Sequence, residues 1–281
     1  MKKVLFALLA IFMMTSCAQE KKVSLRWATF NVRYDNPGDS LNNWKFRANR
    51  VCQFITDKQL DVVGTQEVLF NQFNDMKERL PQYAAVGVGR DDGKTKGEYA
   101  AIFYRKDKFD ALDSGTFWLS ETPEKVGVMG WDAVCVRIAT WAKLQDKRTG
   151  KIFMAVNTHF DHVGEVARRE SALLIIRKIK EIVGDRPAVV TGDFNVDDQS
   201  EAYKTMVSNE FVLNDAHKVA KQKEGVDYTF HNFAKIKPAE CQKIDFIFTT
   251  PQIEVMSSTI PQEQPEALLS DHNPQWTELN F

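Results

Sequence analysis

Apolar residues recur along the chain in short runs that alternate with two longer stretches at helical spacing. Residues 25–32 alternate apolar and polar side chains as a half-buried strand does, and residues 61–68 form a short apolar run that ends in polar residues. Residues 44–59 and 164–183 have the spacing of amphipathic helices. Their apolar faces carry Phe46, Val51, Phe54 and Ile55 in the first stretch, and Ala167, Leu174 and Ile175 in the second.

The remaining apolar runs predict many strands and few helices. Strands are expected at 83–89, 99–105, 133–144, 151–160, 187–196, 243–250 and 275–281. Polar turns at 91–97 and 146–150 separate two pairs of them. This pattern lacks the regular strand–helix alternation of a doubly wound fold, and two packed mixed sheets flanked by helices suit it better.

The first residues have the pattern of an export signal. Lys2 and Lys3 precede an apolar run from Val4 to Met14, which is too short for a confident membrane span. Small residues then precede Cys17. We expect residues 1–16 to be a lipoprotein-type signal peptide, with Cys17 lipidated. The alternative is an ordinary signal peptide cleaved near Ala18.

Composition and charge describe an ordinary globular body. Residues 22–281 contain no linker or repeat, so one domain is expected. Without Lys2 and Lys3, 35 basic residues face 38 acidic ones, and this net charge of about −3 argues against general duplex binding. Cys52, Cys135 and Cys241 form no CxxC pattern, which favours buried apolar roles.

Ionisable and amide side chains stand at the ends of the apolar strands. Such residues stand at the end of an expected strand, within one or just before one. They are Asn31, Glu67, His159, Asp193, Asn195, Asp245, Asp271 and His272. Burying so many polar groups is costly unless they pair or bind a cation. If the strand ends converge at one rim, a metal-dependent site results. Alternatives remain open for single residues, since Asn31 could cap a turn and Glu67 could cap a helix.

Six short motifs together resemble the endonuclease/exonuclease/phosphatase superfamily, the group that includes deoxyribonuclease I. In chain order they are TFNVR, VVGTQEV, NTHFDH, TGDFNVD, KIDFIF and LSDHNP. Each is weak alone, but they cover nearly the whole chain after its first residues. The resemblance implies a four-layer α/β sandwich, with two mixed sheets face to face and helices outside.

The resemblance also implies roles for these residues in a phosphoesterase that uses Mg²⁺ or Mn²⁺. Glu67 matches the main metal ligand, with Asn31 beside it, and Asp271 belongs to the same metal set. Asp193 and Asn195 match the pair that orients and activates the attacking water. Asp245 matches a buried supporting acid, while His159 and His272 match histidines that contact the phosphate. Asp271 need not be the acid that holds the His272 ring.

The substrate and location are less constrained by the sequence. We expect a phosphoester from nucleic acid, a phospholipid headgroup or a phosphorylated sugar, contacted by Arg137, Arg168, Trp131 and Phe233. The protein is expected to be a monomer outside the cytoplasm, held at a bacterial membrane by its N-terminal lipid. Two rivals remain: a catalytically silent ligand-binding lipoprotein, and a zinc hydrolase using His159 and His162.

Overall fold

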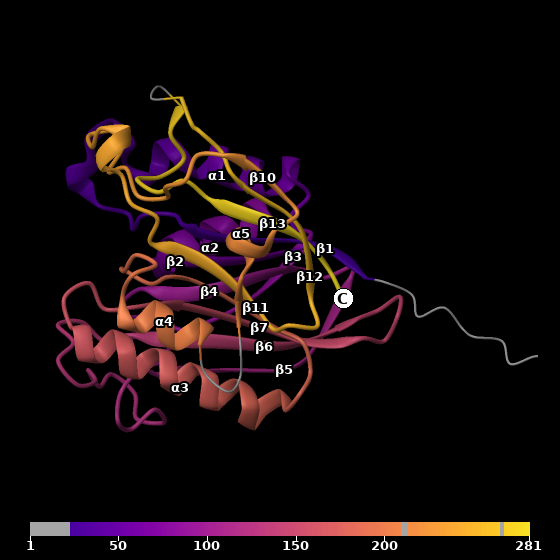
Figure 1. Ribbon diagram of the computed structural model, residues 1–281. Helices are drawn as coiled ribbons and strands as arrows, with labels where there is room; N and C mark the ends of the chain where they lie inside the picture. The colour runs from indigo at the N-terminus through magenta and orange to yellow at the C-terminus, as the bar shows by residue number, and fades with distance from the viewer. Residues whose placement is uncertain (1–22, 209–212, 265–266) are drawn as a thin grey trace, which may run out of the picture.

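Two mixed β-sheets make up the centre of the molecule (Figure 1). The computed structural model describes residues 23–208, 213–264 and 267–281, and the predicted signal peptide and Cys17 lie outside them. One sheet contains β1 (Ser24–Asn31), β2 (Val62–Val68), β3 (Tyr83–Val86), β4 (Tyr99–Arg105), β10 (Gln222–Gly225), β12 (Glu254–Ile260) and β13 (Gln275–Asn280). The other contains β5 (Phe109–Trp118), β6 (Ile138–Asp146), β7 (Ile152–His159), β8 (Ala188–Asp193), β9 (Asn214–Asp215) and β11 (Asp245–Thr249).

Both sheets mix parallel and antiparallel neighbours. The seven-stranded sheet has the order β10-β12-β13-β1-β2-β4-β3, and the six-stranded sheet has the order β5-β6-β7-β8-β11-β9. β1 runs parallel to β2, and β7 runs parallel to β8. The polar ends of these parallel pairs therefore lie at one edge of each sheet.

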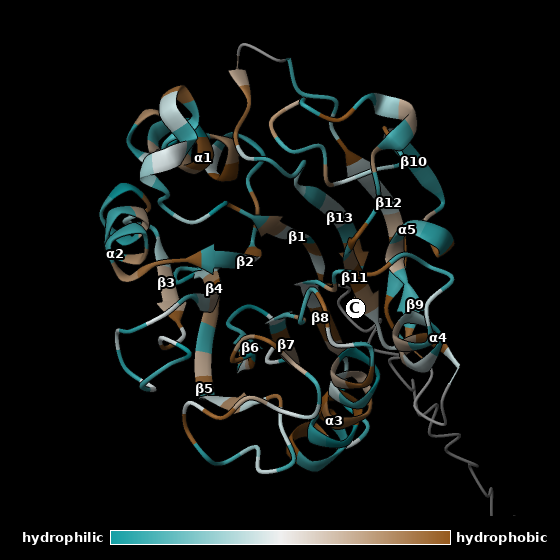
Figure 2. Ribbon diagram, turned by 90° about the vertical axis from the view of Figure 1, so that its left-hand side faces the viewer, coloured by the Kyte–Doolittle hydropathy of each residue, from teal (hydrophilic) through white to brown (hydrophobic). Residues whose placement is uncertain are grey.

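Helices cover the outer faces. They are α1 (Trp44–Asp57), α2 (Phe70–Arg79), α3 (Glu165–Val183), α4 (Glu201–Val207) and α5 (Ala216–Val219), with short 3₁₀ segments η1 (Pro37–Asn42) and η2 (Pro238–Glu240). Figure 2 shows α1 and α2 on one side of the molecule and α3 near the opposite side. No helix among the described residues is long and apolar enough to cross a membrane.

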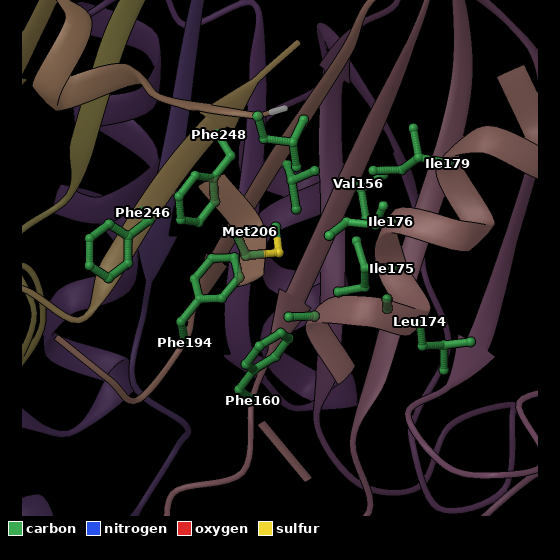
Figure 3. Close-up of a cluster of buried hydrophobic side chains, with 14 of the residues drawn as sticks. Val156, Phe160, Leu174, Ile175, Ile176, Ile179, Phe194, Met206, Phe246 and Phe248 are labelled. Carbon is green, nitrogen blue, oxygen red and sulfur yellow. The ribbon is translucent and has the colours of Figure 1, made fainter. Parts of the chain in front are cut away.

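Three large apolar clusters among the described residues fill the spaces between these layers, and a smaller fourth contains Ala100, Trp118 and Ile138. Trp27, Phe153 and Ile247 belong to the cluster between the two sheets. A second cluster packs α1 and α2 against the seven-stranded sheet, and a third packs α3 and α4 against the six-stranded sheet. In the third, Phe160 and Phe194 meet edge to face, with ring centroids 4.7 Å apart (Figure 3). These layers confirm the predicted four-layer sandwich.

The secondary structure differs from the sequence expectation in several places. Residues 133–137 precede β6 as a loop, because Asp161 accepts hydrogen bonds from the backbone N–H groups of Val134 and Cys135. The short or polar strands β5, β9, β10 and β12 had no clear apolar pattern. Phe46, expected on the buried face of α1, is 49% exposed and lies against the Lys45 ammonium group.

A polar layer lies between the sheets beside the apolar core. The Asn157 side chain on β7 donates to the carbonyls of Thr65 and Ala101 in the other sheet, and it accepts from Gln66 at 2.6 Å. Gly64 permits this close approach, since a Cβ there would lie 2.1 Å from the Thr191 Oγ1 atom. The sheets are therefore held in register by hydrogen bonds near the polar strand ends.

Candidate active site

The strand registers bring the predicted polar residues to one edge of the sandwich. Asp193 at the end of β8 pairs with His159 at the end of β7 and with Asp245 at the start of β11. From the other sheet, Asn31 ends β1 and its amide nitrogen lies 2.9 Å from Asp193 Oδ2. The same nitrogen lies 3.4 Å from Nε2 of His272, which precedes β13. Residues from both sheets therefore face one another at the shared edge.

Two carboxylates and an imidazole form a compact group at this edge. The ligand atoms of Glu67, Asp193 and His272 all lie within 4.8 Å of one another. Asn31 Nδ2 donates to Glu67 Oε1 at 3.0 Å as well as to Asp193, so one amide links both carboxylates. Its oxygen accepts the Arg33 N–H at 3.0 Å, so Asn31 holds the carboxylates with its nitrogen.

The backbone at Glu67 departs from strand geometry. Its φ is 61°, and the pairing of β2 with β4 shifts register between Thr65 and Val68. The Tyr34 N–H donates to Glu67 Oε2 at 3.1 Å and stabilises this orientation. A non-glycine residue at positive φ costs free energy, and such positions concentrate at functional sites. The bulge therefore turns the Glu67 carboxylate toward Asn31.

His272 is held by a buried carboxylate from another element. Its Nδ1 atom lies 2.8 Å from Asp245 Oδ2. Burial alone lowers the pKa of His272, but Asp245, Asp193 and Asp271 outweigh that effect and raise it to about 10. The ring is therefore an imidazolium at neutral pH, and its Nε2–H is directed toward Asp193, 3.8 Å away. Asp245, and not the adjacent Asp271, is the partner of this ring.

Asp193 is a carboxylate whose proton affinity is unusually high. Burial and the nearby Asp245 raise its pKa to about 7, against the opposing effects of His272 and the Asn31 hydrogen bond. Asn195 follows with φ 50°, and its backbone N–H donates to Asp193 Oδ1 at 3.0 Å. This turn places the Asn195 amide beside the carboxylate.

His159 lies on the other side of Asn195 and stays neutral. Its Nε2 atom is 3.1 Å from Asn195 Nδ2, and its Nδ1 atom is 3.7 Å from Glu98 Oε2. Burial, followed by the charges of Arg137 and Arg90, lowers its pKa well below the usual value. Glu98 was not singled out in the sequence, although it directly precedes a predicted strand, which is the signal that identified the other site residues.

Two arginines near the site were also missed. Arg33 pairs with Asp39 at 2.9 Å and lies 3.9 Å from Glu67 and 3.7 Å from Asp271. Asp271, predicted as a metal ligand, therefore faces Arg33 and lies outside the compact carboxylate group. Arg47 is fully buried and donates to the backbone carbonyls of Val32 and Leu269. These hydrogen bonds join the loop that follows β1 to the loop that precedes β13.

The four predicted substrate contacts do not gather at one place. Arg137 is buried beside the site, with Nη1 4.0 Å from Glu98 Oε2 and Nη2 3.3 Å from His162 Nδ1. Arg168 on α3 donates to the Asp161 carbonyl. Trp131 packs partly against the α3 core cluster, and Phe233 is 7% exposed beneath the Arg47 guanidinium. Phe233 thus packs the loops, whereas Arg137 lies beside Glu98.

The histidines of the zinc alternative point to different neighbours. His162 groups with Cys135 and Asp161, whereas His159 belongs to neither candidate metal group among the described residues. Both Asp161 oxygens already accept backbone N–H groups, one from Gly164 at 2.8 Å and the other from Cys135 at 3.0 Å. This arrangement does not favour zinc held by His159 and His162.

Comparison with known proteins agrees with this geometry. A structure described as an endonuclease/exonuclease/phosphatase from Bacteroides vulgatus is 71% identical, with a TM-score of 0.91 over 92% of this chain and 98% of that one. A mannosyl-6-phosphatase from Bacteroides thetaiotaomicron is 42% identical, with a TM-score of 0.84 over 92% of this chain and all of the other. Nocturnin of Drosophila melanogaster is 25% identical over 76% of this chain, which spans only 37% of that longer protein.

The family profile covers the same region as the six sequence motifs. The Endonuclease/Exonuclease/phosphatase family profile matches residues 28–272, from the middle of β1 to the imidazolium of the site. The chain therefore belongs to the endonuclease/exonuclease/phosphatase family.

Proposed function

We propose that this protein is a divalent-metal-dependent phosphatase that acts on a phosphorylated sugar. One observation carries the proposal: the Glu67 and Asp193 carboxylates, linked by Asn31, face the His272 imidazolium at an edge shared by both sheets. The choice of a sugar phosphate is supported by the 42% identity to a mannosyl-6-phosphatase across nearly the whole chain.

The donor set suits a hard divalent cation. Mg²⁺ and Mn²⁺ prefer oxygen ligands, and the Glu67 and Asp193 carboxylates supply them within one small group. Without a cation, burial and the nearby Asp245 carboxylate raise the pKa of Asp193. A bound cation would polarise a phosphoryl oxygen and neutralise charge that develops on it. Glu67 is the residue best placed to hold it, with Asp193 alongside.

Three side chains have chemical tasks in hydrolysis. Asp193, whose Oδ1 atom accepts the Asn195 backbone N–H at 3.0 Å, lies beside the Asn195 amide and accepts a proton from the attacking water. Asn195 orients that water, because its amide lies beside Asp193 and is fixed by the Phe160 carbonyl at 3.0 Å. His272 donates from Nε2 to a phosphoryl oxygen, which stabilises negative charge as the P–O bond breaks, and the departing alkoxide takes a proton from solvent to give the alcohol.

Arg137 and His159 lie beyond Asn195, where the phosphate group of the substrate would bind. Arg137 is 6% exposed, and its Nε–H makes no hydrogen bond among the described residues, although Asp161 Oδ2 lies 3.7 Å away. A phosphate at the site would accept from such a donor, and the neutral His159 keeps Asn195 oriented. The Glu98 carboxylate lies 2.7 Å from Arg90, 4.0 Å from Arg137 and 3.7 Å from His159, so it positions these groups.

A phosphoester panel tests the proposal. The purified protein should hydrolyse mannose 6-phosphate and p-nitrophenyl phosphate with Mg²⁺ or Mn²⁺, and EDTA should abolish the activity. Asp193→Ala should reduce turnover by at least about a hundredfold. DNA, RNA and sphingomyelin serve as competing substrates in the same panel. Activity that survives EDTA, or a fully active Asp193→Ala variant, contradicts the proposal.

The same panel separates the two rival functions. A catalytically silent ligand-binding protein would hydrolyse none of these esters with any metal. A zinc enzyme would recover activity with Zn²⁺ and not with Mg²⁺ or Mn²⁺, and His162→Ala would abolish it. We expect neither outcome. The chain carries the expected polar residue at each position of the six family motifs, and His162 lies outside the group formed by Glu67, Asp193 and His272.

The N-terminal expectations remain part of the proposal. We propose that residues 1–16 direct export, that lipidated Cys17 anchors the protein outside the cytoplasm, and that residues 22–281 act as one monomeric catalytic domain. Metabolic labelling with a radioactive fatty acid, compared between the natural chain and Cys17→Ser, tests the anchor. Equal labelling of both chains contradicts it.

A further inference from the structure

Arg137, which the proposed reaction assigns to the phosphate, contacts a side chain that the reaction leaves without a task. Its Nη2 atom lies 3.3 Å from Nδ1 of His162, in the segment between β7 and α3. Arg137 is 6% exposed, whereas His162 is exposed to solvent. A buried guanidinium is therefore joined to a solvent-facing ring beside the candidate active site.

The chemistry of this contact fixes the protonation state of the ring. Guanidinium nitrogens can only donate hydrogen bonds, so His162 Nδ1 accepts from Arg137 Nη2. Nδ1 therefore carries a lone pair, the ring is neutral and its single N–H is on Nε2. A second proton would place an N–H group against the guanidinium and remove the hydrogen bond.

The two acids near Arg137 are hydrogen-bonded to other donors. Glu98 Oε2 accepts from Arg90 at 2.7 Å and lies 4.0 Å from Arg137 Nη1. Asp161 Oδ2 accepts two backbone N–H groups and lies 3.7 Å from Arg137 Nε. Both acids attract the guanidinium by charge, but neither is within hydrogen-bond distance of it. Among the described residues, His162 is therefore the hydrogen-bond acceptor that orients Arg137.

We propose that His162 is the positioning residue for Arg137, and that its neutral ring fixes the orientation in which the guanidinium meets the substrate phosphate. This role rests on the proposed phosphatase function, in which Arg137 contacts the phosphate. Orientation matters because a guanidinium binds phosphate best through two parallel N–H groups. A guanidinium that is free to rotate loses this alignment and binds phosphate more weakly.

The contact also makes phosphate binding depend on pH. Arg137, Asp161 and Cys135 face the His162 ring, and a charge on the ring also acts on His159. The Asp161 charge favours protonation of the ring, and the Arg137 charge opposes it. Because solvent reaches the ring, it takes up a proton as pH falls. The protonated ring no longer accepts from Nη2, so the affinity for phosphate decreases.

Calorimetric titration of the mature protein with inorganic phosphate and Mg²⁺ tests the contact without requiring turnover. At pH 8, His162→Leu should weaken phosphate binding about fivefold to tenfold, the effect of losing one hydrogen bond. His162→Asn places a side-chain oxygen near the position of Nδ1 and should bind phosphate within about twofold of the natural protein. Normal binding by His162→Leu, equal losses in both variants, or no phosphate binding by the natural protein would overturn the proposal.

Two further variants separate orientation of Arg137 from a general structural effect. Val163→Ala alters the neighbouring side chain, which is 56% exposed, and should bind phosphate normally. His162→Leu should add little to the loss caused by Arg137→Gln, because the group that His162 orients is already absent. Additive losses would show that His162 acts independently of Arg137, contrary to the proposal.

Hydrolysis of p-nitrophenyl phosphate provides a second readout. His162→Leu should raise KM more than it lowers kcat. Between pH 8 and pH 6, KM of the natural protein should rise relative to KM of His162→Asn, because the amide takes up no proton. The ionisation of the substrate is the same for both proteins and cancels in this ratio. A ratio that stays constant would show that the charge on His162 does not control phosphate binding.

Failure of the proposed function gives a different result from failure of this role. If phosphate binding weakens in His162→Leu but the natural protein hydrolyses no phosphoester, the proposed function alone is wrong. If the protein hydrolyses phosphoesters and His162→Leu leaves both KM and phosphate affinity unchanged, the role of His162 alone is wrong.

Discussion

The charge on His272 depends on carboxylates brought to it by the fold. Asp245, 27 residues earlier in the chain, hydrogen-bonds Nδ1, and Asp193 lies opposite Nε2. Together with Asp271 they raise the pKa of a ring whose burial would otherwise lower it. An imidazolium at this position can donate to a phosphate throughout the neutral range.

Asp245→Asn should therefore shift the pH profile as well as the rate. The substitution removes the largest charge that raises the His272 pKa, so the ring should lose its proton as pH rises through a value well below 10. We expect kcat to fall about a hundredfold at pH 8, with partial recovery at lower pH. His272→Ala should lose at least as much at every pH.

Steady-state hydrolysis of p-nitrophenyl phosphate between pH 5 and 9 measures both effects. Asp113→Asn, at an exposed position on β5, is the matched control and should keep the natural profile. If kcat of Asp245→Asn depends on pH above neutrality as kcat of the natural protein does, Asp245 does not set the charge on His272.

At the scale of elements, one side chain joins the loop before β6 to the start of α3. Asp161 is 2% exposed and accepts from Val163 and Gly164 on one oxygen, and from Val134 and Cys135 on the other. Arg137, two residues after Cys135, is positioned beside Glu98 and His159 by this attachment. The loop conformation thus depends on a carboxylate distant in sequence.

Asp161→Asn should destabilise the protein in a pH-dependent way. Burial would raise the pKa of Asp161, but the four backbone N–H groups outweigh it and lower the pKa below 3.8. The stabilisation is therefore present above pH 4 and is lost as pH falls through the folded-state pKa. We expect a loss of about 2 kcal/mol in unfolding free energy at pH 7, since an amide has one oxygen for these donors.

Urea unfolding at pH 7 and pH 3 measures this difference. The difference in stability between the natural and Asp161→Asn proteins should be smaller at the lower pH. Asp185→Asn, at an exposed turn after α3, serves as the control and should change stability little at either pH. A pH-independent loss in Asp161→Asn would contradict the electrostatic account.

At the scale of the whole molecule, the candidate cation site spans the two sheets. Glu67 belongs to the seven-stranded sheet and Asp193 to the six-stranded sheet. The Asn157 hydrogen bonds already join these sheets beneath the site. A cation held by both carboxylates would stabilise the same contact.

Mg²⁺ or Mn²⁺ should therefore raise the melting temperature. At a concentration about a hundredfold above Kd, a ligand specific to the folded state adds about 2.7 kcal/mol, which corresponds to at least about 5 °C for a protein of this size. Glu67→Gln should abolish most of this increment. Glu78→Gln, at an exposed position on α2, should retain it.

Differential scanning calorimetry with EDTA, Mg²⁺ and Mn²⁺ makes the measurement without requiring a substrate. A melting temperature that does not respond to either cation, or an increment of equal size in Glu67→Gln, would remove Glu67 from the metal site.

The order of motifs and the strand pattern predicted the sandwich and most of the polar residues that meet at the candidate site. Asn31, Glu67 and Asp193 could be found because polar residues at the ends of apolar strands require an explanation even in isolation. Glu98 has the same signal and was overlooked. The short strands β9 and β10 could not be found, because two-residue or fully exposed polar strands carry no periodic hydrophobic signal.

The sequence by itself determined the layered fold, the family motifs and the identity of the buried polar residues, because local periodicity and burial cost act on each segment separately. Only the tertiary structure decided the pairing of those residues. Asp245 rather than Asp271 holds His272, Asp271 faces Arg33, and Phe233 packs beneath Arg47. Such partners depend on strand register and loop contacts between segments far apart in the chain, and no local pattern encodes those distances.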